Sequence, residues 1–169
     1  TRSRLGLALG AFERRAEGRY LRERVMIRPR FMPRDLLRLE AAVDRGDCVS
    51  IVAELPAVRS TPAEMFGTPV GLAPGAPSLA WKKGVALLPV FCRRHGPLDW
   101  EVRVDAPLPA VEGRPRRRYV ERSTRLFVSR LQSWVAASPA DWRVWDYRRS
   151  FWSDPAAAPE EARRAEGAE

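Results

Sequence analysis

Apolar residues recur along the chain with helical spacing in three segments. The first is residues 3–17, where Leu5, Ala8, Leu9 and Phe12 share one side. The second is residues 33–44. Pro33 is suited to the first turn of this helix, and Gly46 is expected to end it. The third, residues 117–136, carries the longest stripe, consisting of Val120, Thr124, Phe127, Leu131 and Trp134. The pattern therefore predicts three amphipathic helices.

Continuous apolar runs predict strands between these helices. Residues 48–53 and 85–91 are almost wholly apolar, which is typical of strands covered on both faces in a parallel sheet. Pro77 and Gly84 bound a short helix between them, so the three segments read as a right-handed βαβ unit. The sequence thus predicts the α/β class, with a three-layer domain whose mostly parallel sheet is flanked by helices.

Two weaker patterns complete the domain. Residues 100–104 alternate between apolar and charged side chains and predict a half-exposed strand entered through the turn Gly96-Pro97, and residues 25–27 suggest a further short strand. We expect one domain over residues 1–152 and a disordered tail over 153–169, where the sequence is polar and aperiodic. Because the chain does not begin with Met and its first periodic segment starts at once, we expect it to be a piece of a longer protein.

The composition shows an excess of basic over acidic residues. The 30 Lys and Arg residues outnumber the 21 Asp and Glu residues, giving a net charge of +9 that comes mostly from arginine. Arginine forks suit phosphates and carboxylates, so the excess favours anionic partners, although compositional bias gives the same numbers. The candidate basic surface is a run of seven arginines, Arg19, Arg22, Arg24, Arg28, Arg30, Arg34 and Arg38.

Cysteine usage and hydropathy set limits on the environment. Cys48 and Cys92 both lie in apolar runs, and we expect them to be buried thiols of a reducing compartment. No segment approaches the roughly 20 apolar residues that cross a bilayer. The basic and apolar start lacks a small-residue cleavage site, so we do not expect export.

A set of landmarks between residues 54 and 151 resembles a known family. They are Glu54, Met65-Phe66-Gly67, Gly75, Leu79-Ala80, Gly84, Leu87-Leu88-Pro89-Val90, Trp142, Trp145, Arg148, Arg149 and Phe151. In this order they resemble the late acyltransferases of lipid A biosynthesis, a branch of the lysophospholipid acyltransferase superfamily, over residues 33–152. The resemblance implies lipopolysaccharide biosynthesis and a peripheral position on the cytoplasmic face of the inner membrane. It implies acyl-ACP or acyl-CoA as donor, an anionic membrane lipid or glycolipid as acceptor, no nucleic acid, and no metal or cofactor besides the thioester co-substrate.

Acyl transfer to a hydroxyl requires a base, which is usually a histidine near neutral pH. The family's catalytic pair has the spacing H-x4-D, and it would lie upstream of Thr1. His95 is the one histidine of the chain, and Asp99 and Glu101 stand at the wrong offsets from it. We therefore expect His95 to be a solvated turn residue and assign no catalytic residue to this chain.

Glu54 and Arg59 are the candidate substrate-binding residues. Glu54 follows a buried-type strand at the sheet edge where ligands bind in α/β folds, and the family places an acid there. Arg59, in the same loop, suits a phosphate of donor or acceptor. The structural alternative for Glu54 is a strand-end acid that caps a backbone amide or pairs with Arg59, and the alternative for Arg59 is a solvated loop arginine. We expect both residues on the rim of an apolar cleft walled by residues 65–83.

Arg148 and Arg149 are the candidate membrane contacts. They follow Trp142 and Trp145 in a segment whose Trp and Arg content suits the headgroup region. For the tryptophans themselves we expect packing at the edge of the core, with membrane contact as the alternative. Two other classes remain open. One is a non-catalytic membrane or protein interaction domain on the same fold, and the other is a basic nucleic-acid-binding domain, which only the charge supports.

Overall fold

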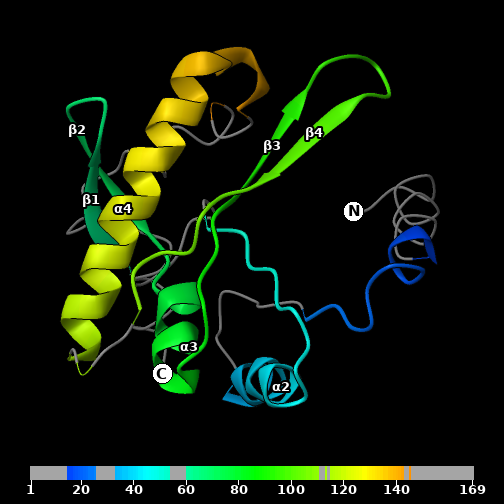
Figure 1. Cartoon of the computed structure of the whole chain (residues 1–169), viewed down its shortest axis with the longest axis vertical. Coiled ribbons are helices and arrows are strands. Elements are labelled where there is room, and N and C mark those ends of the chain that lie inside the picture. Colours follow the sequence, from blue (N-terminus) through cyan, green and yellow to red (C-terminus); the bar gives the residue numbers. More distant parts are fainter. Residues whose placement is uncertain are drawn as a thin grey trace, which may run out of the picture.

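The computed structural model describes residues 15–25, 33–53, 60–110, 113, 115–142 and 145. Residues 15–17 are helical, and the rest of the helix expected at 3–17 lies outside the described residues. The other elements, in chain order, are α2 (Pro33–Asp44), β1 (Thr61–Met65), β2 (Thr68–Leu72), α3 (Gly75–Lys83), β3 (Val90–Arg94), β4 (Trp100–Val104), α4 (Arg116–Ala137) and the 3-10 turn η1 (Pro139–Asp141). Figure 1 shows α4 running along the β1–β2 hairpin, with α3 near its N-terminal end.

The expectation of a mostly parallel sheet is wrong. The described residues form two separate antiparallel hairpins of two strands each, β1–β2 and β3–β4. Residues 48–53, expected as a strand of the parallel sheet, form no helix or strand, and residues 85–89 are likewise outside any strand. Helices and strands still alternate, so the class stays α/β in its element content, but the parallel βαβ unit is absent from the described part of the chain.

The backbone of residues 87–90 forms hydrogen bonds with residues 104–108, which follow it in the chain, and not with residues 48–53. The amide of Asp105 donates to the carbonyl of Pro89 at 2.9 Å, and the amide of Leu108 donates to the carbonyl of Leu87 at 2.8 Å. Pro89 has no amide hydrogen, so it cannot donate into a ladder, and β3 begins only at Val90. The apolar run therefore extends the β3–β4 hairpin.

The β1–β2 hairpin was not predicted. Its two-residue turn places Phe66 at φ 51° and Gly67 at φ 72°, the left-handed conformations of a type I′ turn, which matches the twist of the flanking strands. Pro62 and Pro69 argued against strands in the sequence, because proline in a sheet is tolerated only on edge strands. In a two-stranded hairpin every strand is an edge, and the prolines are accommodated.

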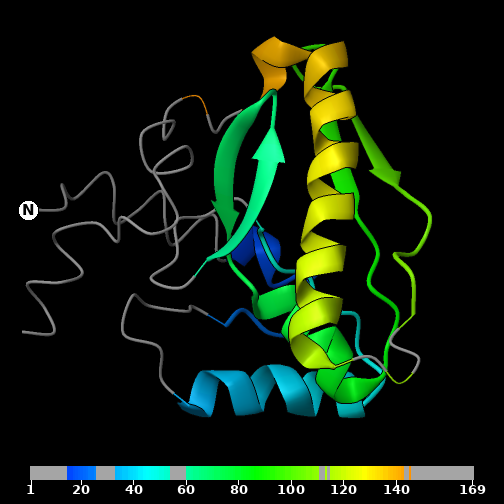
Figure 2. The ribbon, with the colours of Figure 1, turned by 90° about the vertical axis from the view of Figure 1, so that its left-hand side faces the viewer.

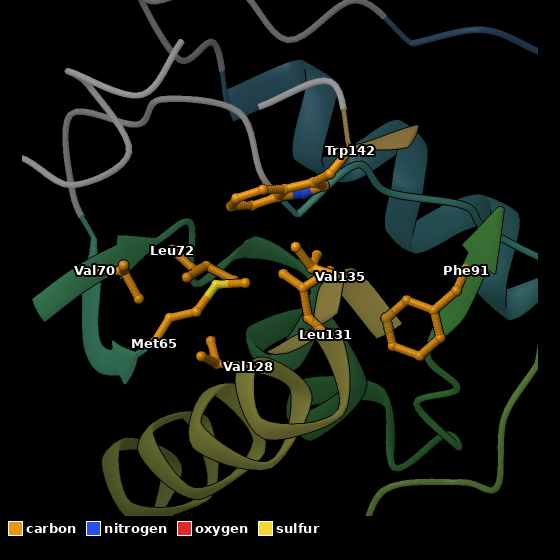
Figure 3. Packing of buried hydrophobic residues seen from close by; sticks show 8 residues of the cluster. All are labelled: Met65, Val70, Leu72, Phe91, Val128, Leu131, Val135 and Trp142. Carbon is orange, nitrogen blue, oxygen red and sulfur yellow. The ribbon is translucent and has the colours of Figure 1, made fainter. Parts of the chain in front are cut away.

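One hydrophobic cluster joins the hairpin to α4 and to the segment after it. It consists of Met65, Val70, Leu72, Phe91, Val128, Leu131, Val135 and Trp142, with Ala53, Ala63, Phe127 and Trp134 packed around it. Figure 3 shows the hairpin side chains facing those of α4, with the Trp142 ring beside them. We call this group the hairpin cluster. A two-stranded hairpin is marginal alone, so the cluster is what makes it stable.

A second, smaller cluster fixes α3 to the N-terminal half of α4. Ala80 packs there against Tyr119 and Val120. Ion pairs in turn tie α3 to α2, with Lys82 Nζ 2.5 Å from Glu40 Oε1 and Lys83 Nζ 2.6 Å from Asp44 Oδ2. These pairs connect α2 to the rest of the molecule by charge more than by apolar packing.

The predictions for the segments that form α2, α3 and α4 agree with the structure. Helix α3 ends where Gly84 adopts the left-handed conformation, with φ 64°, and its amide caps the carbonyl of Ala80. Helices α2 and α4 fall within a residue of their expected bounds. The burial prediction for the thiols is wrong, because Cys48 and Cys92 are both exposed. None of the helices in the described part of the chain is long and apolar enough to span a bilayer.

We expect Met65→Ala to lower the free energy of unfolding by about 2–5 kcal/mol, because the fully buried Met65 side chain would leave a cavity in the hairpin cluster. Urea denaturation followed by circular dichroism measures the change. Leu37→Ala is the control, since Leu37 on α2 is 61% exposed and should cost no more than about 0.5 kcal/mol. Equal losses for the two variants would contradict the packing described here.

Candidate functional site

An open apolar groove of about 420 Å³ lies at the C-terminal end of α4. Three segments line it: Phe66 and Thr68 from the β1–β2 hairpin, Val135 and Ala136 from α4, and Pro139 and Trp145 from the segment that follows. The turn of the hairpin and this end of α4 lie at the same end of the molecule (Figure 1). Volume and lining are typical of small-molecule sites, which are concave and mostly apolar. We therefore treat this groove as the candidate site.

One wall of the groove is held in place by a side-chain hydrogen bond from α4. The amide of Phe66 donates to Gln132 Oε1 at 2.7 Å, across 66 residues of sequence. This bond satisfies the turn amide and fixes the hairpin turn over the helix. The Phe66 ring stays 45% exposed, so an apolar surface remains open at the groove.

Trp145 lines the groove and packs against a second tryptophan, Trp142. Trp142 is buried in the hairpin cluster, and Trp145 meets it edge to face, with ring centroids 4.9 Å apart at an angle of 83°. The Trp145 indole also donates to the carbonyl of Pro139 at 2.7 Å. The core packing expected for the tryptophans is thus confirmed for Trp142, and Trp145 lines the groove.

All four predicted site residues, Glu54, Arg59, Arg148 and Arg149, lie outside the described residues, so their assignments stay predictions. The structure does place the residues from which their segments continue. Ala53, directly before Glu54, packs against the hairpin cluster, which also contains Trp142. The segment after Ala53 and the segment after Trp142 therefore both continue from the hairpin cluster, and the groove lies at the edge of this cluster.

The groove residues of α4 and η1 were missed from the sequence. Phe66 and Thr68 belong to the segment expected to wall a cleft, whereas Val135 and Ala136 were predicted only as helix positions and Pro139 carried no prediction. The sequence signal for the groove was weak: a small residue, Ala136, near the end of a helix leaves room beside it. No group of three or more His, Cys, Asp or Glu residues within the described ranges is arranged to hold a metal ion.

His95 lies in the turn of the β3–β4 hairpin, as predicted, and does not line the groove. Its Nε2 is 2.9 Å from Glu101 Oε2, and both side chains are partly exposed. The hydrogen bond with His95 lowers the pKa of Glu101 below its ordinary value, and the charges of Arg93 and Arg103 act in the same direction against desolvation. The pair closes the hairpin turn, which gives His95 a structural role.

The inner side of this hairpin is fixed on α4 by stacked rings. Phe91 stacks on Phe127 and on Trp134, with centroids 5.8 and 5.6 Å apart, and the Arg93 guanidinium lies 4.3 Å from the centre of the Trp134 ring. The hairpin therefore has one side packed on the helix and one side open.

We expect Glu101→Gln to lower the melting temperature at about pH 7, and the difference from wild type to disappear on acidification. A carboxylate with a depressed pKa stabilises the fold above its ordinary pKa of 4.5, and this contribution is lost as the pH falls through the folded-state value. Thermal melts between about pH 7 and pH 3 test this. Glu64→Gln is the control, because Glu64 on β1 is exposed and forms no ion pair with a described residue. A pH-independent difference would refute the role of this pair.

Comparisons with known proteins bear on what this groove is for. The family model described as bacterial lipid A biosynthesis acyltransferase matches residues 16–149, which is most of the chain and includes every described element. A search of curated proteins found no match. The match spans the residues on which the resemblance was based, apart from Phe151, and it starts upstream of them. The chain therefore belongs to the family of bacterial lipid A biosynthesis acyltransferases.

Proposed function

We propose that this domain is part of an enzyme that moves a fatty acyl chain from an acyl-carrier or CoA thioester to a hydroxyl of a membrane glycolipid such as a lipid A precursor. The observation that carries the proposal is the family match over residues 16–149. The apolar groove at the end of α4 is in keeping with an acyl chain, and the net charge of +9 is in keeping with anionic partners.

The reaction needs few participants. The acceptor hydroxyl oxygen attacks the thioester carbonyl carbon, the new C–O ester bond forms, and the C–S bond breaks. A base takes the hydroxyl proton, and the departing sulfur leaves as a thiol. Donors aimed at the developing oxyanion lower the barrier. The acyl thioester acts as a co-substrate, and the step as written balances without a further cofactor.

We do not assign the base to His95. This histidine is bonded to Glu101 in a hairpin turn, and neither residue lines the groove. The printed sequence contains no H-x4-D motif, because Trp100 stands five residues after His95. We therefore propose that residues 1–169 alone transfer no acyl group and supply binding surfaces, while the base stands on an H-x4-D motif elsewhere in the complete enzyme.

We propose that Glu54 and Arg59 bind substrate at the rim of the groove. Glu54 follows Ala53, and consecutive Cα atoms are about 3.8 Å apart, so covalent geometry keeps Glu54 near the hairpin cluster. Arg59 is joined to Ser60, which leads into β1. An acid beside an arginine suits the orientation of a hydroxyl and a phosphate at one site.

We propose a peripheral position on the cytoplasmic face of the inner membrane, with Arg148 and Arg149 contacting lipid phosphates. Their segment continues from Trp145, whose partly exposed ring borders the groove. Trp and Arg side chains together suit the headgroup region of a bilayer. An acyl chain entering the groove from a membrane would then pass this ring.

We expect Glu54→Gln to lower turnover by about tenfold or more while leaving the melting temperature nearly unchanged, since a positioning carboxylate is lost without loss of packing. The test is acyl transfer to a lipid A precursor, measured by mass spectrometry on the protein as its gene encodes it. Glu64→Gln is the matched control and should keep full turnover. Full activity of Glu54→Gln would show that Glu54 is a structural acid, and no transfer by the wild type would favour an interaction domain.

We expect Ala136→Phe to weaken binding of a fluorescent fatty acid severalfold, because the new ring occupies the groove that Ala136 lines. Ala137→Phe is the control, since Ala137 is also exposed at the end of α4 but does not line the groove. Fluorescence titration of both variants measures the difference. Equal affinities of Ala136→Phe and Ala137→Phe would exclude the groove as the acyl site.

A further inference from the structure

Three arginines form a stripe along the outer side of α4. Arg118, Arg122 and Arg125 are spaced i, i+4 and i+7, so they share one side of the helix over about 10 Å. Arg118 and Arg125 are exposed and Arg122 is partly exposed. Figure 2 shows α4 along the outside of the molecule, with no described element covering its outer side. We call these residues the arginine stripe.

The stripe differs from the neighbouring cations, which have partners. Arg116 donates to Ser78 Oγ at 3.2 Å, Arg117 pairs with Glu121 at 2.8 Å, and Arg130 lies 3.5 Å from Asp105 Oδ2. The three residues of the stripe form no ion pair with any described residue. Their guanidinium groups are therefore available to another molecule.

The position of the stripe works against the helix itself. Helix α4 has no acid in its first turn, where Arg118 opposes the dipole, whereas Arg122 and Arg125 lie beyond that turn. Arg118 and Arg122 are also like charges four residues apart, which destabilises a helix further. Local choices that conflict with the fold are typical of functional sites, where a binding partner compensates for them.

We propose that the arginine stripe docks an acidic protein surface, namely that of the carrier protein that delivers the acyl group. This rests on the proposed function, which requires an acyl donor. Guanidinium forks match carboxylates in a bidentate manner, and a helix of the partner with acids at the same spacing could pair with all three arginines over two turns. Electrostatic complementarity of this kind gives specificity and rapid encounter.

A lipid surface fits the stripe less well. Surface adsorption of a helix depends on apolar side chains that enter the bilayer beside the cations. None of the large exposed apolar side chains among the described residues lies on α4. Those of the β3–β4 hairpin, such as Val102 and Val104, alternate with the residues that face α4 and point away from it. Polar Ser129 and Ser133 follow the stripe along the helix.

The test measures binding of apo-acyl carrier protein, which lacks the prosthetic arm and the acyl chain. Wild type is compared with the triple variant Arg118→Glu, Arg122→Glu, Arg125→Glu and with the control Arg117→Glu, whose arginine is exposed but paired. We expect the triple variant to bind at least about tenfold more weakly at low salt and the control within about twofold of wild type. Wild-type binding should weaken as salt rises.

A thermal melt of the same variants separates docking from folding. The triple variant should melt close to wild type, because Arg118→Glu favours the helix dipole while glutamates at 118 and 122, and at 121 and 125, repel each other, and both surface effects are small. Equal affinity of the triple variant and wild type, a matching loss in Arg117→Glu, or no carrier binding by the wild type would each overturn the proposal. So would stripe-dependent binding to phosphatidylglycerol vesicles alone. Stripe-dependent carrier binding without acyl transfer by the complete protein would sustain the docking surface and contradict the proposed function.

Discussion

Burial of the inner side of α4 is the interaction on which the other elements depend. Its residues Val128, Leu131 and Val135 cover the β1–β2 hairpin, and Tyr119 and Val120 cover α3. Phe127 and Trp134 hold β3 through the Phe91 ring. A two-stranded hairpin in water is marginal at best, so neither hairpin would be stable without a surface to pack on. One 22-residue helix provides that surface for both.

The same helix relates the candidate site to the outer surface. Gln132 fixes the turn that carries Phe66, and Val135 and Ala136 line the groove, whereas the arginine stripe occupies the outer side nearer the N-terminus. A helix rises about 1.5 Å per residue, so Arg125 and Ala136 are separated by roughly 16 Å along the axis. If a carrier protein docks at the stripe as proposed, the acyl chain that it carries would have to extend along the helix over this distance to reach the groove.

The sequence predicted the helices well and the strand pairing poorly, for a physical reason. A helix satisfies its backbone hydrogen bonds within one segment, so the apolar stripe and the stop at Gly84 suffice to locate it. A strand satisfies its hydrogen bonds with a partner elsewhere, and the apolar run 85–91 contains no information on which partner that is. The type I′ turn at Phe66 could be read only from Gly67 and was hidden by the two prolines beside it.

The site shows the same division between local and distant information. Landmark residues were sufficient to recognise the family, and the tryptophans near the end were correctly linked to packing for Trp142. The groove could not be predicted, because it forms where a hairpin turn, a helix end and Trp145 meet. Ala53 and Trp142 share one cluster although 89 positions separate them in the sequence. The segments that continue from these two residues therefore start from the same cluster, which the sequence could not show.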